Sequence, residues 1–196
     1  MQITDHKSGK PCFRKRRKRY DEPGHARELT FSCYGRYHFL DRDRTRLWFV
    51  EALQHARKRW PVDLWAWVIM PEHVHLLVYP RQPNLEIGRF QATLKEEVAR
   101  KAIAWLEGNA RQWLPRITVR EGKRLRRRFW QPGGGYDRNV VEPTTVHSMV
   151  EYIHANPVRR GLVARPEDWE WSSARWYAGL EPVHVQMDRT IPACPG

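Results

Sequence analysis

The stretch VIMPEHVHLLV, residues 68–78, decides the fold and holds the first candidate site residues. A Pro-Glu pair separates two apolar runs, which predicts two strands, residues 62–70 and 73–80, joined as a hairpin. Side chains alternate between the two faces of a strand. His73 and His75 should therefore project from one face, and the residue between them from the other.

Two imidazoles at this spacing can hold one divalent metal ion. The same short pattern also occurs where two histidines lie on the solvent-exposed side of a half-buried strand. The motif alone does not separate these two interpretations. Glu72, immediately before the strand, is expected to be an exposed residue of the turn.

The composition indicates a polyanionic partner, with nucleic acid as the first candidate. The 196 residues include 35 Lys and Arg against 22 Asp and Glu, a formal net charge of +13. A membrane surface is the second candidate, but no apolar run is long enough to span a bilayer and the N-terminus lacks the apolar core of a secretory signal. The three cysteines lie far apart without a CxxC pair, which indicates free thiols in a reducing cytoplasm.

We expect three parts along the chain. Residues 1–24 form a basic, flexible arm, residues 25–180 one folded domain, and residues 181–196 an irregular tail. The arm contains an unbroken run of basic residues in which Arg16 and Arg17 are candidate phosphate contacts. The alternative for this arm is a solvated tail that only aids solubility.

Hydrophobic periodicity predicts the remaining elements of the domain. These are a strand at residues 27–36 and helices at residues 43–60, 84–109 and 144–156. Asn84 is expected to cap the second helix, and Pro157 to end the third. Helices that interrupt strands without a regular βαβ rhythm indicate an α+β fold, with a mainly antiparallel sheet and helices on one face.

The third helix carries a second group of candidate site residues. Its apolar stripe should face the core, whereas Tyr152 and Asn156, four residues apart, lie on one neighbouring face. A phenol and a carboxamide at this spacing can serve as a nucleophile and a metal ligand. The alternative is a tyrosine at the edge of the core and an asparagine that helps to end the helix.

Two groups of basic residues are candidate nucleic-acid contacts. One precedes the aromatic pair Phe129-Trp130, and the other follows the helix that carries Tyr152. They are Lys123, Arg124, Arg126, Arg127 and Arg128, and Arg159 and Arg160. The aromatic pair either stacks on bases or is buried beneath a charged hairpin tip. The second group either contacts a phosphate or interacts with the negative end of the helix.

Four segments taken together resemble the REP-associated tyrosine transposases, which belong to the single-tyrosine transposases with a His-hydrophobic-His motif. The segments are WVIMPEHVHLL, FWQPGGGYDRNV, YIHANPVRRGLV and DWEWSSARW, and they follow the order of that family. The resemblance covers residues 27–178. The glycine triplet 133–135 stands where relatives often carry bulkier residues.

The resemblance implies a ferredoxin-like fold, in which helices flank a mainly antiparallel sheet. It implies that His73 and His75 hold a divalent ion, Mg²⁺ or Mn²⁺, and that Asn156 completes the metal site. It also implies that Tyr152 is the nucleophile. The implied substrate is single-stranded DNA beside a hairpin of a repetitive extragenic palindrome. The implied reaction leaves a 5′-phosphotyrosine and a free 3′-hydroxyl.

The resemblance also sets expectations for the whole protein. We expect a transposase-like endonuclease and strand transferase, cytoplasmic and associated with the nucleoid, and monomeric rather than dimeric. Two alternatives stay open. One is a non-catalytic protein that binds hairpin DNA or RNA through a vestigial site. The other is a metal-dependent phosphodiesterase that uses water.

Overall fold

The computed structural model describes residues 3–4, 11–12 and 23–194. The two short N-terminal segments pair as antiparallel strands, β1 (Ile3–Thr4) and β2 (Pro11–Cys12). Arg16 and Arg17, the candidate phosphate contacts of the basic arm, lie outside the described residues.

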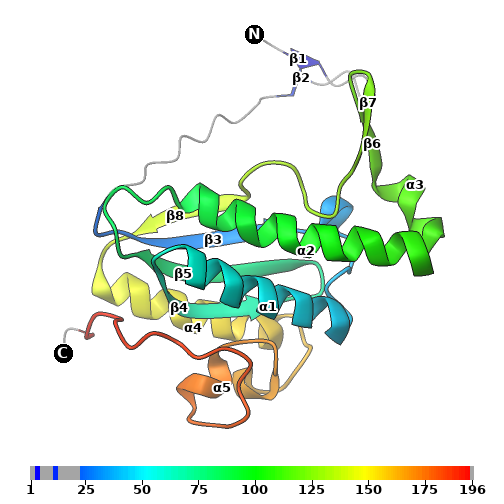
Figure 1. Ribbon diagram of the computed structural model, residues 1–196. Helices are drawn as coiled ribbons and strands as arrows, with labels where there is room; N and C mark the ends of the chain where they lie inside the picture. The colour runs from blue at the N-terminus through cyan, green and yellow to red at the C-terminus, as the bar shows by residue number, and fades with distance from the viewer. Residues whose placement is uncertain (1–2, 5–10, 13–22, 195–196) are drawn as a thin grey trace.

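A four-stranded antiparallel sheet forms the centre of the protein (Figure 1). Its strands lie in the order β4 (Val62–Ile69), β5 (His73–Pro80), β3 (Ala26–Ser32) and β8 (Tyr136–Val140). Helix α1 (Asp43–Arg59) connects β3 to β4, and α2 (Ile87–Asn109) follows β5 and precedes β8. Two interleaved βαβ units in one antiparallel sheet are the ferredoxin-like arrangement. The predicted hairpin and the predicted α+β fold are therefore confirmed.

Helices cover both faces of the sheet, so the expectation of helices on one face is wrong (Figure 1). Helices α1 and α2 pack on one face, over core residues such as Leu29 and Phe90. Helix α4 (Pro143–Arg159) packs on the other face, where Ile153 joins a second apolar cluster. All eight residues of β4 are buried, as expected for a strand with protein on both sides.

Two expected boundaries near the strands differ in the structure. The first strand ends at Ser32, and Tyr34–Arg36 forms a short 3₁₀ helix, η1. Asn84 does not cap α2, because this helix begins at Ile87 and its N-cap is Glu86.

Helix α4 continues through Pro157 to Arg159, so the expectation that this proline ends the helix is wrong. Proline has no N–H, which leaves the carbonyl of Ile153 without its helical donor. The side-chain amide of Asn156 lies 3.4 Å from that oxygen and donates a hydrogen bond of 2.8 Å to the carbonyl of Tyr152. These contacts offset the missing bond and allow one more turn.

The segment after α2 projects from the body of the protein. It contains η2 (Arg111–Trp113), α3 (Leu114–Ile117) and a two-stranded ribbon of β6 (Thr118–Glu121) and β7 (Arg124–Arg127). We call β6 and β7 the basic ribbon; it extends away from the sheet (Figure 1). Among the described residues, no helix has both the length and the apolar character needed to cross a bilayer.

The aromatic segment after α4 packs back on the sheet. It contains η3 (Pro166–Asp168) and α5 (Ala174–Tyr177). The backbone N–H of Ser173 donates to the carbonyl of Trp67 at 3.0 Å, and the N–H of Trp67 donates back to the hydroxyl of Ser173 at 2.9 Å. The imidazole Nε2 of buried His154 lies 2.7 Å from the same hydroxyl.

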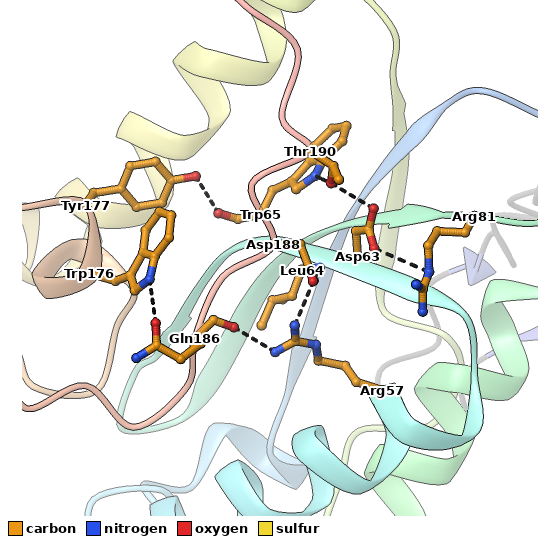
Figure 2. Close-up of polar contacts among 10 residues, drawn as sticks. All are labelled: Arg57, Asp63, Leu64, Trp65, Arg81, Trp176, Tyr177, Gln186, Asp188 and Thr190. Carbon is orange, nitrogen blue, oxygen red and sulfur yellow. Dashed lines mark hydrogen bonds and ion pairs between the residues drawn. The ribbon is translucent and has the colours of Figure 1, made fainter.

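Residues 184–190, which we call the C-terminal strap, run along the edge strand β4 (Figure 2). Asp188 exchanges two hydrogen bonds with the backbone of Leu64, accepting one at its carboxylate at 2.8 Å and donating one from its N–H at 3.1 Å. The same carboxylate pairs with Arg57 at 2.7 Å. Val185 and Met187 are buried in the main core. The strap thus has no regular secondary structure but is a fixed part of the domain.

Candidate active site

His73 and His75 lie on the face of the sheet that α4 covers, and their ring nitrogens converge. Both are buried, with 8% and 6% of their surface exposed, and their Nε2 atoms are 3.1 Å apart. Two neighbouring ligands of an octahedral ion with bonds of about 2.1 Å would lie about 3.0 Å apart. The spacing of the two nitrogens therefore fits two ligands of one divalent ion.

Oxygen atoms face the other nitrogen of each imidazole. Nδ1 of His75 lies 2.8 Å from the hydroxyl of Thr30 and 3.8 Å from a carboxylate oxygen of Glu28. Nδ1 of His73 lies 3.2 Å from Oε1 of Glu72, close but without the alignment of a hydrogen bond, so this nitrogen is a buried polar atom without a partner. Oxygen groups behind metal-binding imidazoles orient the rings and raise their basicity. This arrangement favours unprotonated Nε2 atoms directed at a shared point.

The environment keeps His73 neutral and Glu72 charged. Burial, together with the charge of His75, lowers the pKa of His73 to about 4, although Glu72 acts in the opposite direction. Burial alone would raise the pKa of Glu72, but the hydrogen bond and the positive charge of Arg160 act against it, and the pKa lies below its ordinary value. A neutral imidazole is the form that binds a metal ion.

Tyr152 lies beside the histidine pair and remains accessible. Its ring meets the ring of His75 edge to face, with centroids 5.7 Å apart, and 39% of the residue is exposed. The guanidinium of Arg159 lies 5.2 Å from the centre of the Tyr152 ring. An open pocket of about 410 Å³ adjoins it, lined by Glu28, Thr30, His75, Tyr136, Arg138, Met149 and Tyr152. The phenol and His75 are thus both reached from this pocket.

Asn156 lies one helical turn after Tyr152 and one turn before Arg160. Tyr152 contacts His75, and Arg160 pairs with Glu72 beside His73. Its amide nitrogen is engaged with helix carbonyls, so its oxygen is the atom left to act as a ligand. Within the described part of the chain, no three His, Cys, Asp or Glu side chains converge as a metal site. An ion held by His73 and His75 would therefore need further oxygen donors, of which the amide of Asn156 is the candidate from the protein.

Glu72 is buried, with only 2% of its surface exposed, so the expectation of an exposed turn residue is wrong. Its Oε1 receives the guanidinium groups of Arg160 at 2.9 Å and Arg36 at 3.1 Å. Arg36 has a φ of 54°, an unfavourable conformation for a residue with a side chain. Sequence reasoning missed Arg36, Thr30 and Glu28 because nothing in their local patterns refers to the histidines across the sheet.

The basic ribbon carries most of the other predicted DNA contacts. Arg126 and Arg128 pair with Glu121, and Arg127 pairs with Glu107. Lys123 and Arg124 are exposed at the turn and, within residues 23–194, have no acidic partner.

Phe129 and Trp130 follow the ribbon but are buried. They belong to the main core, and the indole N–H of Trp130 donates to the carbonyl of Lys95 at 2.9 Å. Of the two interpretations of this aromatic pair, burial is therefore correct.

The comparisons with known proteins agree with this geometry. No family model matches the chain. A Haemophilus influenzae protein named as a REP-associated tyrosine transposase is 28% identical over 153 residues, which are 73% of this chain and 81% of that protein. A solved structure of a REP-associated tyrosine transposase bound to a REP hairpin superposes with a TM-score of 0.65 at 20% identity, over 90% of this chain and 93% of that one. The resemblance of this chain to the REP-associated tyrosine transposases, first seen in its sequence motifs, is thereby confirmed.

Proposed function

We propose that this protein is a metal-dependent endonuclease and strand transferase that cuts single-stranded DNA beside a hairpin, through a 5′-phosphotyrosine at Tyr152. One observation carries the proposal: an accessible tyrosine contacts His75, which belongs to a buried pair of imidazoles whose Nε2 atoms are 3.1 Å apart. The hairpin substrate is supported by the solved relative, which is bound to a REP hairpin. REP-like palindromes are therefore the DNA to try first.

His73 and His75 would hold Mg²⁺ or Mn²⁺ through Nε2, with the side-chain oxygen of Asn156 as a further ligand. When bound, such an ion neutralises charge on a phosphate and orients it. The surrounding residues prepare the site for this role. Burial lowers the pKa of His73 and keeps its imidazole neutral. Thr30 faces Nδ1 of His75, and Glu72 faces Nδ1 of His73.

Tyr152 would attack the phosphorus of the scissile phosphodiester with its hydroxyl oxygen. A new P–O bond to the tyrosine forms, the bond between phosphorus and the 3′ oxygen breaks, and the released 3′ oxygen takes up a proton to become the 3′-hydroxyl. The phenol loses its proton in this step, which balances the proton that the 3′ oxygen gains. The guanidinium of Arg159 lies beside the ring, where it could contact the phosphate. The covalent link conserves the phosphodiester, so a later 3′-hydroxyl can rejoin the strand.

A single tyrosine handles one bond at a time, and we propose a monomer that works in the cytoplasm near the nucleoid. Arg159, Arg160 and the exposed residues of the basic ribbon would contact DNA phosphates. The two arginines lie beside the phenol and the histidine pair, whereas the ribbon would contact DNA farther from the cut.

The test is incubation of the protein with end-labelled hairpin DNA carrying single-stranded flanks, with Mn²⁺ or with EDTA, followed by a denaturing gel. We expect a covalent protein–DNA adduct with Mn²⁺ that Tyr152→Phe and His73→Ala abolish. Tyr136→Phe, which removes a hydroxyl from the same pocket, should keep the adduct.

The other outcomes identify the alternatives. Cut DNA without an adduct would show a phosphodiesterase that uses water. Bound but uncut DNA would show a non-catalytic binding protein.

A further inference from the structure

A second pocket, of about 280 Å³, lies among α1, α2 and η2, and aromatic rings form much of its wall. Trp48, Trp105 and Trp113 line it together with Phe39 and Phe129. The three tryptophans are only partly buried. Large rings that are half exposed around a hollow are typical of ligand sites rather than of a closed core.

Arginines accompany these rings. The guanidinium of Arg44 lies 3.6 Å from the centre of the Trp105 ring, and that of Arg116 lies 4.9 Å from the centre of the Trp113 ring. Neither arginine has an acidic partner within the described part of the chain, where both are exposed. Arg44 lines the pocket, so its hydrogen-bond donors are available there, and Arg116 lies beside one of the lining rings.

The pocket lies on the side of the sheet that α1 and α2 cover, next to the segment that follows the basic ribbon. Phe129, which follows the ribbon, forms part of its wall. The segment 33–42 joins the pocket to the active site: the N–H of Cys33 donates to the carbonyl of Glu72 at 2.8 Å, and the N–H of Leu40 donates to the carbonyl of Pro71 at 2.9 Å. His38 and Arg42 of this segment line the pocket.

We propose that this pocket binds one unpaired nucleobase of the DNA strand, stacked against its aromatic and guanidinium planes. The proposal rests on the proposed function, which makes DNA the substrate. Flat rings and arginine planes are the groups on which proteins stack bases. The volume suits a single heterocycle, and the neighbouring arginines suit the phosphates on either side of it.

The experiment measures the affinity of the protein, in EDTA, for labelled hairpins that carry one abasic nucleotide at successive unpaired positions. Loss of one stacked base should weaken binding of the wild-type protein about 10-fold at one position. Trp105→Leu should weaken binding of the intact hairpin to a similar extent and remove the sensitivity to that abasic position. Arg44→Ala, a change at an exposed side chain, should weaken binding of the intact hairpin and reduce the sensitivity to that abasic position, each to a smaller extent.

Trp60→Leu is the matched control, because Trp60 is a partly buried tryptophan outside the pocket. It should keep both the affinity and the abasic sensitivity. The pocket assignment is overturned if no position is sensitive, or if the sensitivity persists in both Trp105→Leu and Arg44→Ala. In those cases hairpin binding itself would stand, and the proposed function would not be contradicted. If the wild-type protein binds no hairpin, both proposals fail.

Discussion

Nη1 of Arg160 lies 2.9 Å from Oε1 of Glu72, and this contact joins the end of α4 to the turn before β5. The helix carries Tyr152 and the strand carries both candidate metal-binding histidines. An ion pair with one buried partner is costly to break, because the buried charge is left without compensation. The position of the phenol relative to the imidazoles therefore depends in part on Glu72, which touches neither the phenol nor the proposed substrate bond.

Glu72→Gln should weaken metal binding. The amide keeps the shape of the side chain but removes the negative charge beside Nδ1 of His73. Loss of an oxygen group behind a metal-binding imidazole typically lowers metal affinity about 10–100-fold. Titration calorimetry with Mn²⁺ measures the effect directly. Glu86→Gln, at an exposed residue that pairs with Arg89, is the control and should bind Mn²⁺ like the wild type. Equal affinities for both variants would show that Glu72 does not act on the metal site.

Gly135→Ala should destabilise the protein more than Gly133→Ala. Both glycines have a left-handed φ, 72° and 89°, but a Cβ at Gly135 would lie 2.1 Å from the carbonyl oxygen of Thr30, whereas nothing lies within 4 Å of one at Gly133. The left-handed conformation costs about 1 kcal/mol at either position, and the overlap at Gly135 adds about 1–3 kcal/mol. Urea unfolding of the two variants gives the difference. Equal losses of stability in the two variants would mean that β8 shifts freely away from β3.

His154→Gln should flatten the dependence of stability on pH. Burial lowers the pKa of His154 from 6.5 to about 4. Between these values the unfolded chain binds a proton that the folded protein excludes, so the free energy of unfolding falls as the pH drops from 6.5 toward 4, by up to about 3 kcal/mol. Glutamine can still bond to Ser173 but does not titrate. Urea unfolding in EDTA at several pH values tests this. His38→Gln, at an exposed histidine, should leave the profile unchanged, and a wild-type profile in His154→Gln would contradict the argument.

The exposed turn of the basic ribbon should contribute more to DNA binding than its paired arginines. Lys123→Ala combined with Arg124→Ala removes two charges without acidic partners among the described residues. The slope of log affinity against log salt should then fall by roughly 1.5–2. Arg127→Ala is the control, because Glu107 already neutralises that arginine, and it should change the slope less. A larger change of slope in Arg127→Ala than in the double variant would mean that DNA contacts the paired arginines of the ribbon rather than its turn.

Local sequence patterns were sufficient to predict three of the four strands of the sheet, β3, β4 and β5, and the helix that carries Tyr152. Alternation in β5 placed both histidines on one face, and helical spacing placed Tyr152 and Asn156 one turn apart. The second layer of helices could also have been predicted, because β4 contains the uninterrupted apolar run LWAWVI rather than an alternating one.

Long-range partners could not be predicted in this way. The contact of Arg36 with Glu72 joins residues from different elements, and a single sequence carries no signal for such a pair. The end of α4 was mispredicted for a related reason, since the rule for residues before proline ignores the side-chain amide of Asn156, which supports the last turn.

The C-terminal strap also bears on how the protein would behave after proteolysis. An open strand edge is a template for strands of other chains, and Asp188 occupies the backbone groups of Leu64 on that edge. A protease cut after residue 180 would uncover these groups and empty the core positions of Val185 and Met187. Such a nicked protein should self-associate into insoluble aggregates, so these last residues act as a guard against aggregation.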